Sequence, residues 1–191
     1  RNSIIVRIKF PNRKVGEKYI TYTKEAGKNQ KINERKIQKY KEREGEMQSF
    51  FKKKYYEPEL QTQISPYLSR IASASIDISD GLAQDLQHLC NNSKCGAFVN
   101  LNLLPLSPIC KILVKQKKVQ LKDIFSKGDD YQILFTANKN KRNLIKKISK
   151  STSTKVSIVG VIRNKSIGKT IKLSNEKLAL PKTLGYIHNF N

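Results

Sequence analysis

The sequence has no long hydrophobic run and few cysteines or histidines. No apolar stretch approaches the roughly 20 residues that a helix needs to cross a bilayer, and none follows a basic N-terminus as in a secretory signal. We therefore expect a cytoplasmic protein without a membrane segment. Cys90, Cys95 and Cys110, with the distant His88 and His188, match neither a disulfide framework nor a zinc site. We interpret the thiols as core-filling side chains.

Acids are also scarce: 15 Asp and Glu stand against 38 Lys and Arg, which gives a net charge of +23. A basic excess is typical of nucleic-acid-binding proteins because cations neutralise phosphates. However, 30 of the 38 cations are lysines, and the chain is rich in Asn and Ile, as expected from low-GC coding. A selected phosphate-binding surface favours Arg and interleaved aromatics. We therefore interpret the charge as compositional drift and consider a nucleic-acid partner unlikely.

The length of 191 residues fits one domain with an extension, and we place the boundary near residue 58. Residues 1–58 are interpreted as a poorly specified basic extension, with a short strand over 4–10 and a loosely periodic helix over 30–55. After it, apolar spacing predicts helices over 60–71, 82–89, 110–117 and 144–148 and strands over 71–78, 96–104, 131–137, 155–162 and 170–173. This alternation predicts an α+β (α/β-like) fold, a mixed β-sheet flanked by helices.

The acids of this second part are concentrated in two motifs. Only seven acids follow residue 60, and four of them lie in these motifs. In the first, Asp77 and Ser79 leave one face of a strand, and Asp80 follows where the strand turns into a helix at Gly81. Two carboxylates and a hydroxyl suit Mg²⁺, and the helix start offers N–H groups to phosphate. The alternative is that Ser79 or Asp80 is only the helix N-cap.

The second motif, Gly128, Asp129, Asp130 and Tyr131, directly precedes an apolar strand. Two acids at the edge of a sheet can bind substrate or metal. The alternative is a simple turn, which Gly-Asp sequences often form.

Taken together and in order, these motifs resemble a known family. The matching segments are 72–82 (ASASIDISDGL), 85–89 (DLQHL), 96–108 (GAFVNLNLLPLSP) and 126–136 (SKGDDYQILFT), with Gly185 and Tyr186 near the end. They are similar to the C-terminal domain of thiamine-monophosphate kinase, a member of the aminoimidazole ribonucleotide synthetase-like superfamily. The resemblance implies the C-terminal kinase domain of that fold for residues 59–191.

The resemblance also implies ATP-dependent phosphorylation of thiamine monophosphate to thiamine diphosphate, with Mg²⁺ as cofactor, ATP as co-substrate and a homodimer in the full-length family. By the family pattern, Asp77 and Asp80 would bind metal and Ser79 would contact the nucleotide. Asp129 would contact the thiamine substrate. Tyr186 would stack on it, or alternatively only pack on the domain as a tail residue. No residue receives a catalytic role beyond positioning the metal.

The sequence also departs from the family pattern. Lys127 replaces a glycine, Asp129 is one methylene shorter than the usual Glu, and Gln132 replaces an acid. Residues 1–54 do not resemble the N-terminal domain, which supplies further metal ligands, most nucleotide contacts and the dimer interface. We therefore expect a fragment, half of a split enzyme or the product of a decaying gene, with little or no activity alone. Two alternatives stay open: another ATP-using superfamily member, and a non-catalytic basic module that binds RNA or another polyanion.

Overall fold

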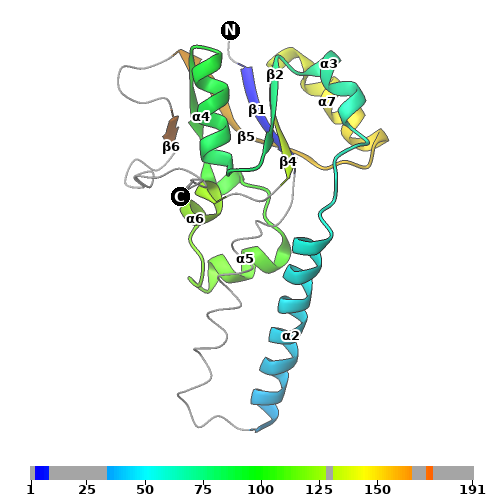
Figure 1. Ribbon diagram of the computed structural model, residues 1–191, viewed down its shortest axis with the longest axis vertical. Helices are drawn as coiled ribbons and strands as arrows, with labels where there is room; N and C mark the ends of the chain where they lie inside the picture. The colour runs from blue at the N-terminus through cyan, green and yellow to red at the C-terminus, as the bar shows by residue number, and fades with distance from the viewer. Residues whose placement is uncertain (1–2, 9–33, 128–130, 165–170, 174–191) are drawn as a thin grey trace, which may run out of the picture.

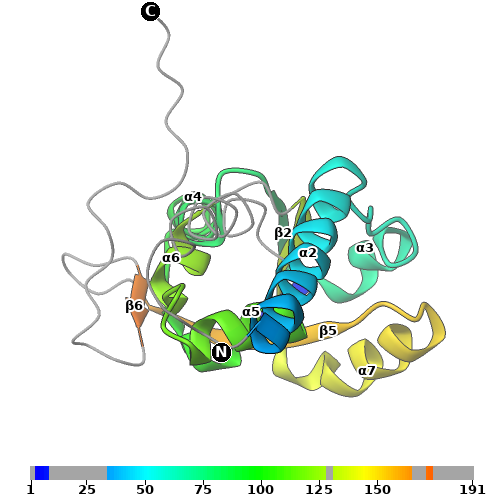
Figure 2. The same cartoon turned by 90° about the horizontal axis from the view of Figure 1, so that it is seen from below.

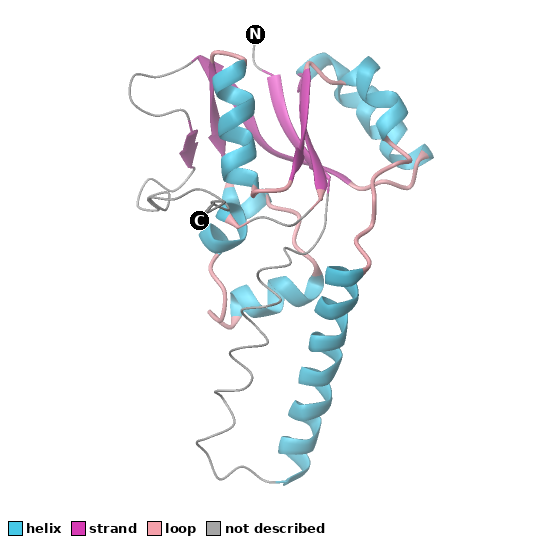
Figure 3. Ribbon diagram, viewed as in Figure 1, coloured by secondary structure: helices cyan, strands magenta, loops and turns pink. Residues whose placement is uncertain are grey.

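Six strands form a single mixed sheet. The computed structural model describes residues 3–8, 34–127, 131–164 and 171–173. Within them the strands are β1 (Ser3–Ile8), β2 (Ala74–Ile78), β3 (Cys95–Val99), β4 (Gln132–Asn138), β5 (Val156–Asn164) and β6 (Ile171–Leu173). Their order is β2-β4-β1-β5-β3-β6, and all neighbours are antiparallel except β3 and β6 (Figure 3). The expected α+β class, a mixed sheet with helices on it, is confirmed.

Helices cover both faces of this sheet (Figure 2). One side carries α4 (Leu82–Asn92) and α6 (Leu121–Ser126), and the other carries α3 (Leu68–Ile71) and α7 (Arg142–Ser151). Consecutive residues of β4 pack against the helices on opposite faces of the sheet, because strand side chains alternate between faces. Leu134 packs in the cluster that contains Leu82 and Leu86, whereas Phe135 packs in the cluster that contains Ile145 and Ile148.

Two elements begin or end differently from the expectation. The helix expected over 60–71 is reduced to the 3₁₀ helix η2 (Ser65–Tyr67) and to α3, and Leu60 before them is 69% exposed. Pro66 sits in the first turn of η2, where the missing N–H costs no hydrogen bond. The strand expected over 96–104 ends at Val99, since the next residues form the 3₁₀ helix η3 (Leu101–Leu103).

The part before residue 58 contributes to the fold, contrary to the interpretation of a solvated extension. β1 lies inside the sheet and pairs with both β4 and β5. The helix α2 (Glu34–Tyr56) runs away from the sheet, and its end packs on α5 (Pro108–Lys115) (Figure 1). Phe51 of α2 is only 3% exposed and lies in one cluster with Cys110 and Leu113. The domain boundary itself stays a prediction.

No helix of the described ranges, α2 included, is long and apolar enough to cross a membrane. Cys90, Cys95 and Cys110 form no disulfide with one another, and Cys90 and Cys110 are buried. Burial, with a further contribution from Cys95, raises the pKa of the Cys90 thiol to about 12. This thiol therefore stays protonated at neutral pH and acts as a small apolar side chain.

Candidate functional site

The turn between β2 and α4 carries the first acidic motif. Asp77 is exposed and the next residue, Ile78, is fully buried, as the alternation of a strand requires. Asp80 is half-buried, and its Oδ2 accepts a hydrogen bond from Gln84 Nε2 at 3.0 Å. The turn therefore presents one carboxylate to solvent and holds a second one against the first turn of α4.

Gly81 closes this turn against another part of the chain. It precedes the first residue of α4 with φ +132° and ψ 148°, a backbone conformation that residues with a side chain rarely adopt. A Cβ at this position would lie 2.9 Å from the carbonyl oxygen of Ser126 and 2.9 Å from the carbonyl carbon of Lys127. Only glycine allows the two backbones to come this close. The contact joins the first motif to the residues just before the second one.

The chain also returns to the turn after the second motif. Lys127 N–H donates to the carbonyl oxygen of Asp123 at 3.1 Å at the end of α6, and Tyr131 N–H donates to the carbonyl oxygen of Ile78 at 2.9 Å. Lys127, just before the second motif, and Tyr131, its last residue, therefore both lie beside the first motif. Asp129, the predicted substrate contact between these flanks, lies outside the described residues.

The pairing of β2 with β4 explains why Tyr131 lies beside the first motif. The last residue of β2, Ile78, pairs with the first residue of β4, Gln132. Because the strands are antiparallel, the segment after β2 and the segment before β4 emerge at the same end of the sheet. Tyr131, at the junction, has φ +49°, which is uncommon for a residue with a side chain, and it is 43% exposed. Strain of this kind concentrates at functional sites.

A third carboxylate, Asp85, lies inside this region. It is 3% exposed, and its Oδ2 accepts a hydrogen bond from Gly81 N–H at 3.1 Å. Burial is the main reason why the pKa of Asp85 rises from its ordinary value of 3.8 to about 6. The hydrogen bond from Gly81 lowers this pKa, and the negative charges of Asp80 and Asp77 raise it. Asp85 therefore lies within electrostatic reach of Asp77 and Asp80, and the turn carries several acids although the chain is strongly basic.

This donor set fits Mg²⁺ better than any softer metal. In the described ranges no group of three or more His, Cys, Asp or Glu side chains is placed to hold a metal ion. Asp77 and Asp80 offer two hard carboxylate ligands, and Mg²⁺ commonly takes one or two carboxylates and fills its other positions with water and phosphate oxygens. A divalent cation would also offset the mutual repulsion of the carboxylates.

The structure brings together part of the predicted site. Asp77, Ser79 and Asp80 share the β2–α4 turn, with Ser79 half-buried, whereas Tyr186, like Asp129, lies outside the described residues. Sequence reasoning assigned no site role to Asp85. A signal was present: residues 82, 85, 86 and 89 fall on one face of a helix, so Asp85 shares the buried face with the leucines at the other three positions.

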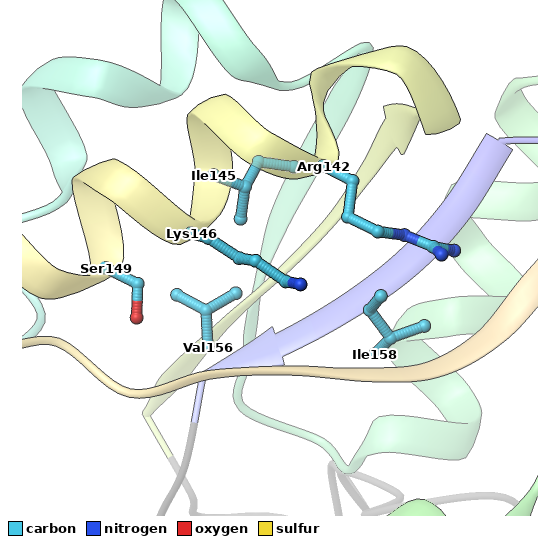
Figure 4. A pocket seen from close by; sticks show the side chains of 6 residues that line it. All are labelled: Arg142, Ile145, Lys146, Ser149, Val156 and Ile158. Atoms are coloured by element: carbon cyan, nitrogen blue, oxygen red, sulfur yellow. The ribbon is translucent and has the colours of Figure 1, made fainter.

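A second feature, a pocket of about 220 Å³, lies elsewhere on the sheet (Figure 4). Its lining comes from α7 and β5, namely Arg142, Ile145, Lys146, Ser149, Val156 and Ile158. β5 is three positions from β2 in the strand order, which corresponds to roughly 14 Å at about 4.8 Å per strand. The pocket has an apolar floor, two cations and no acid, so it is chemically unlike the acidic turn.

Comparison with known proteins supports one family. No family model matches the chain. The chain is 37% identical over 123 residues to the thiamine-monophosphate kinase of Buchnera aphidicola subsp. Schizaphis graminum (strain Sg), covering 63% of this chain and 37% of that protein. It is 33% identical over 144 residues to the thiamine-monophosphate kinase of Buchnera aphidicola subsp. Acyrthosiphon pisum (strain APS), covering 74% of this chain and 43% of that protein. The chain thus spans about two fifths of the length of these curated relatives.

Solved structures share the fold at lower identity. The crystal structure of thiamine-monophosphate kinase from Stenotrophomonas maltophilia K279a superposes with a TM-score of 0.68 at 20% identity, over 91% of this chain and 50% of that chain. AaThiL complexed with AMPPCP and TMP superposes with a TM-score of 0.67 at 18% identity, over 97% of this chain and 52% of that chain. At such identities the likeness shows the fold alone. The sequence matches show that the chain is related to part of thiamine-monophosphate kinase, and the solved structures show that it shares their fold.

Proposed function

We propose that this chain supplies the acidic half-site of a thiamine-monophosphate kinase, an enzyme that transfers a phosphoryl group from ATP to thiamine monophosphate and forms thiamine diphosphate. The observation that carries the proposal is that the described residues around the second acidic motif lie against the first, through Gly81 against Ser126 and Lys127 and through Tyr131 on Ile78. The sequence relationship supports the reaction class. The contacts around the turn support our assignment of that reaction to this end of the sheet.

The electrostatics of the turn fit a reaction between anions. Donor and acceptor both carry phosphates, and Asp77, Asp80 and Asp85 add negative charge where we place them. Phosphates cannot approach such a turn without a cation between them. Mg²⁺, when bound, neutralises charge on phosphate oxygens and on the transferred group. This requirement explains why a basic chain keeps carboxylates rather than lysines at this position.

Individual roles follow from position. We assign Asp77 and Asp80 as Mg²⁺ ligands, because one is exposed and the other is held half-buried by Gln84. Ser79, between them, is assigned to the nucleotide. Asp129 and Tyr186 keep the substrate contacts that the family resemblance implies. These residues position ligands, and the phosphoryl group passes from the β,γ-bridging oxygen of ATP to a phosphate oxygen of the acceptor, in line.

We expect these residues to bind metal without efficient turnover on their own. The described site offers two Mg²⁺ ligands from one turn, whereas the transfer requires a cage that holds donor, acceptor and metals together. Because the chain spans only about two fifths of its relatives' length, the remaining ligands are expected from elsewhere in the complete enzyme. A homodimer, implied by the resemblance, and a cytoplasmic location, expected from the sequence composition, belong to the same proposal.

Binding of Mn²⁺, a paramagnetic substitute for Mg²⁺, tests the site directly by electron paramagnetic resonance. Asp77→Asn and Asp80→Asn should each weaken binding by about tenfold or more, which corresponds to about 1.4 kcal/mol. Glu46→Gln is the matched control, because it removes one exposed carboxylate from α2, far along the chain from the turn. Equal Mn²⁺ affinity in all four proteins would refute the site.

A thiochrome assay for thiamine diphosphate tests the reaction. The chain alone should give turnover near background with ATP, Mg²⁺ and thiamine monophosphate. Robust turnover that is lost in Asp77→Asn would establish the chemistry and contradict the expected inactivity. Robust turnover that survives this substitution would contradict the assignment of the site.

A non-catalytic polyanion-binding function remains the second candidate, because one observation favours it. On α7, Arg142, Lys146, Lys147 and Lys150 are exposed, and two of these cations line the pocket of Figure 4. Steeply salt-dependent binding of unrelated RNAs, with no Mn²⁺ site at the turn, would favour this function over the kinase.

A further inference from the structure

Asp85 and Gly81 are joined by two hydrogen bonds that run in opposite directions. Gly81 N–H donates to Asp85 Oδ2 at 3.1 Å, and Asp85 N–H donates to the Gly81 carbonyl oxygen at 2.9 Å. The second bond is ordinary for the start of a helix. The hydrogen bond to the side chain is unusual. The N–H of the residue before a helix has no partner within the helix, and here it donates to the carboxylate of the fourth helical residue. Asp85 is therefore bound at both its backbone and its side chain to one glycine.

That glycine is the point where the first acidic motif touches the residues that lead to the second one. Its backbone lies against Ser126 and Lys127, with no room for a Cβ. Gly81 also follows Asp80 directly, so the orientation of its peptide group determines where the Asp80 carboxylate points. The side chain that holds the Gly81 N–H thus influences both the Asp80 ligand and the approach of the segment that leads to the second motif.

We propose that Asp85 is a positioning residue of the metal and phosphate site, which fixes the Gly81 peptide so that Asp80 stays in place against the backbone of Ser126 and Lys127. This inference rests on the proposed function, since it deepens the same site. Asp85 itself is not a ligand in it: the side chain is buried on the inner face of α4, and its Oδ2 is engaged by Gly81. Residues that orient the ligands of a metal centre typically change its affinity by about 10- to 100-fold when they are replaced.

Two substitutions separate the hydrogen bond from the charge. Asp85→Asn removes the negative charge but keeps an oxygen that can accept from Gly81 N–H. Asp85→Ala removes both. If positioning is the role of Asp85, the asparagine variant should keep the Mn²⁺ affinity of the wild type and the alanine variant should lose it. If Asp85 acts only through its charge, both variants should change alike.

The experiment combines two readouts on the full chain. Amide hydrogen exchange, measured by NMR, should be slow at Gly81 in the wild type and in Asp85→Asn and fast in Asp85→Ala. Mn²⁺ affinity should follow the same order, with a loss of about 10- to 100-fold only in Asp85→Ala. Glu46→Ala, which deletes an exposed carboxylate of α2, is the control for a general change in charge and should leave both readouts unchanged.

The outcomes distinguish this inference from the function on which it rests. If the wild type binds Mn²⁺ through Asp77 and Asp80 and Asp85→Ala binds it equally well, the positioning role is overturned while the kinase site stands. Equal weakening in Asp85→Asn and Asp85→Ala would also overturn it, because charge alone would then explain the effect. If the wild type binds no Mn²⁺, both proposals fail. Should Asp85→Ala not fold, the comparison of Asp85→Asn with the wild type at Gly81 still decides whether an uncharged acceptor is sufficient.

Discussion

Asp77, Asp80 and Asp85 gather at the β2–α4 turn, while α7, on the opposite face of the sheet, presents Lys146 and Lys147 to solvent (Figure 2). The acids are few: Asp80 accepts a hydrogen bond from Gln84, and Asp85, which is buried, accepts one from the Gly81 N–H. The cations are many, and those of α7 are exposed. A charge that a fold buries or fixes constrains the surrounding chain, whereas a solvated charge can be replaced at little cost. The net charge of +23 therefore says less about function than the position of these few carboxylates.

The largest effect on stability is expected from Gly81→Ala, which changes the acidic β2–α4 turn. The added Cβ would meet backbone atoms of Ser126 and Lys127 at 2.9 Å, in a residue with φ +132°. Strain and overpacking together should lower the free energy of unfolding by about 2 to 6 kcal/mol. Gly45→Ala is the matched control, because a Cβ there meets nothing within 4 Å and lies in helix α2. Urea denaturation should show Gly45→Ala unchanged or more stable by up to about 1 kcal/mol.

The next effect tests what α7 contributes apart from its charges. Ile148 is 6% exposed and packs against Phe135 from the sheet, so Ile148→Ala should destabilise the protein by about 2 to 3 kcal/mol in the same denaturation experiment. Leu144, on the same helix, is 39% exposed, and Leu144→Ala should cost less than about 1 kcal/mol. Similar losses from both substitutions would show that α7 is not anchored by its inner face.

A pH titration tests the buried acid. Because the folded-state pKa of Asp85 is raised to about 6, the folded state holds a proton that the unfolded state releases near pH 4. The contribution of Asp85 to stability is therefore present at low pH and is lost as the pH rises from about 4 to about 6, by roughly 1 to 3 kcal/mol. Asp85→Asn lacks this titration. The difference in unfolding free energy between the two proteins should change across that interval, and a constant difference would contradict the raised pKa.

The smallest effect is expected from the solvated cations. Lys146→Glu and Lys147→Glu, singly, should change stability by less than about 0.5 kcal/mol and should leave Mn²⁺ affinity unchanged, because both side chains are exposed on the other face of the sheet. Binding of unrelated RNA, if it occurs, should weaken and lose part of its salt dependence. Loss of Mn²⁺ binding in these variants would contradict the separation of the two regions.

Local patterns in the sequence predict the elements around the site. Leu82, Leu86 and Leu89 mark α4, Gly81 marks its start, and all three leucines are buried. The turn with Asp77 and Asp80 follows from the same pattern. These predictions succeed because helix periodicity and glycine at a turn depend on neighbouring residues only.

Long-range pairing could not be predicted in the same way. The sequence predicts β1 only as a short strand in a basic segment. Its pairing with both β4 and β5 shows that it is an inner strand of the sheet. Phe51 likewise becomes part of a core only because α5 packs on it. The burial of Asp85 was indicated by its position beside Leu82 and Leu86, but its partner, the Gly81 N–H, depends on a backbone conformation that the sequence does not encode locally.

The hydrogen bond from Tyr131 to Ile78 joins residues that are distant along the chain but adjacent across two strands. This pairing supports the end of β2 that carries the acidic turn, and the unfolded chain lacks that support because closing so long a loop is entropically opposed. A divalent cation that binds the turn in its native conformation therefore adds stability that grows with the cation concentration. The same ion that screens phosphates would thus also stabilise the folded protein. Its binding could then be measured as a rise in the midpoint of unfolding with cation concentration.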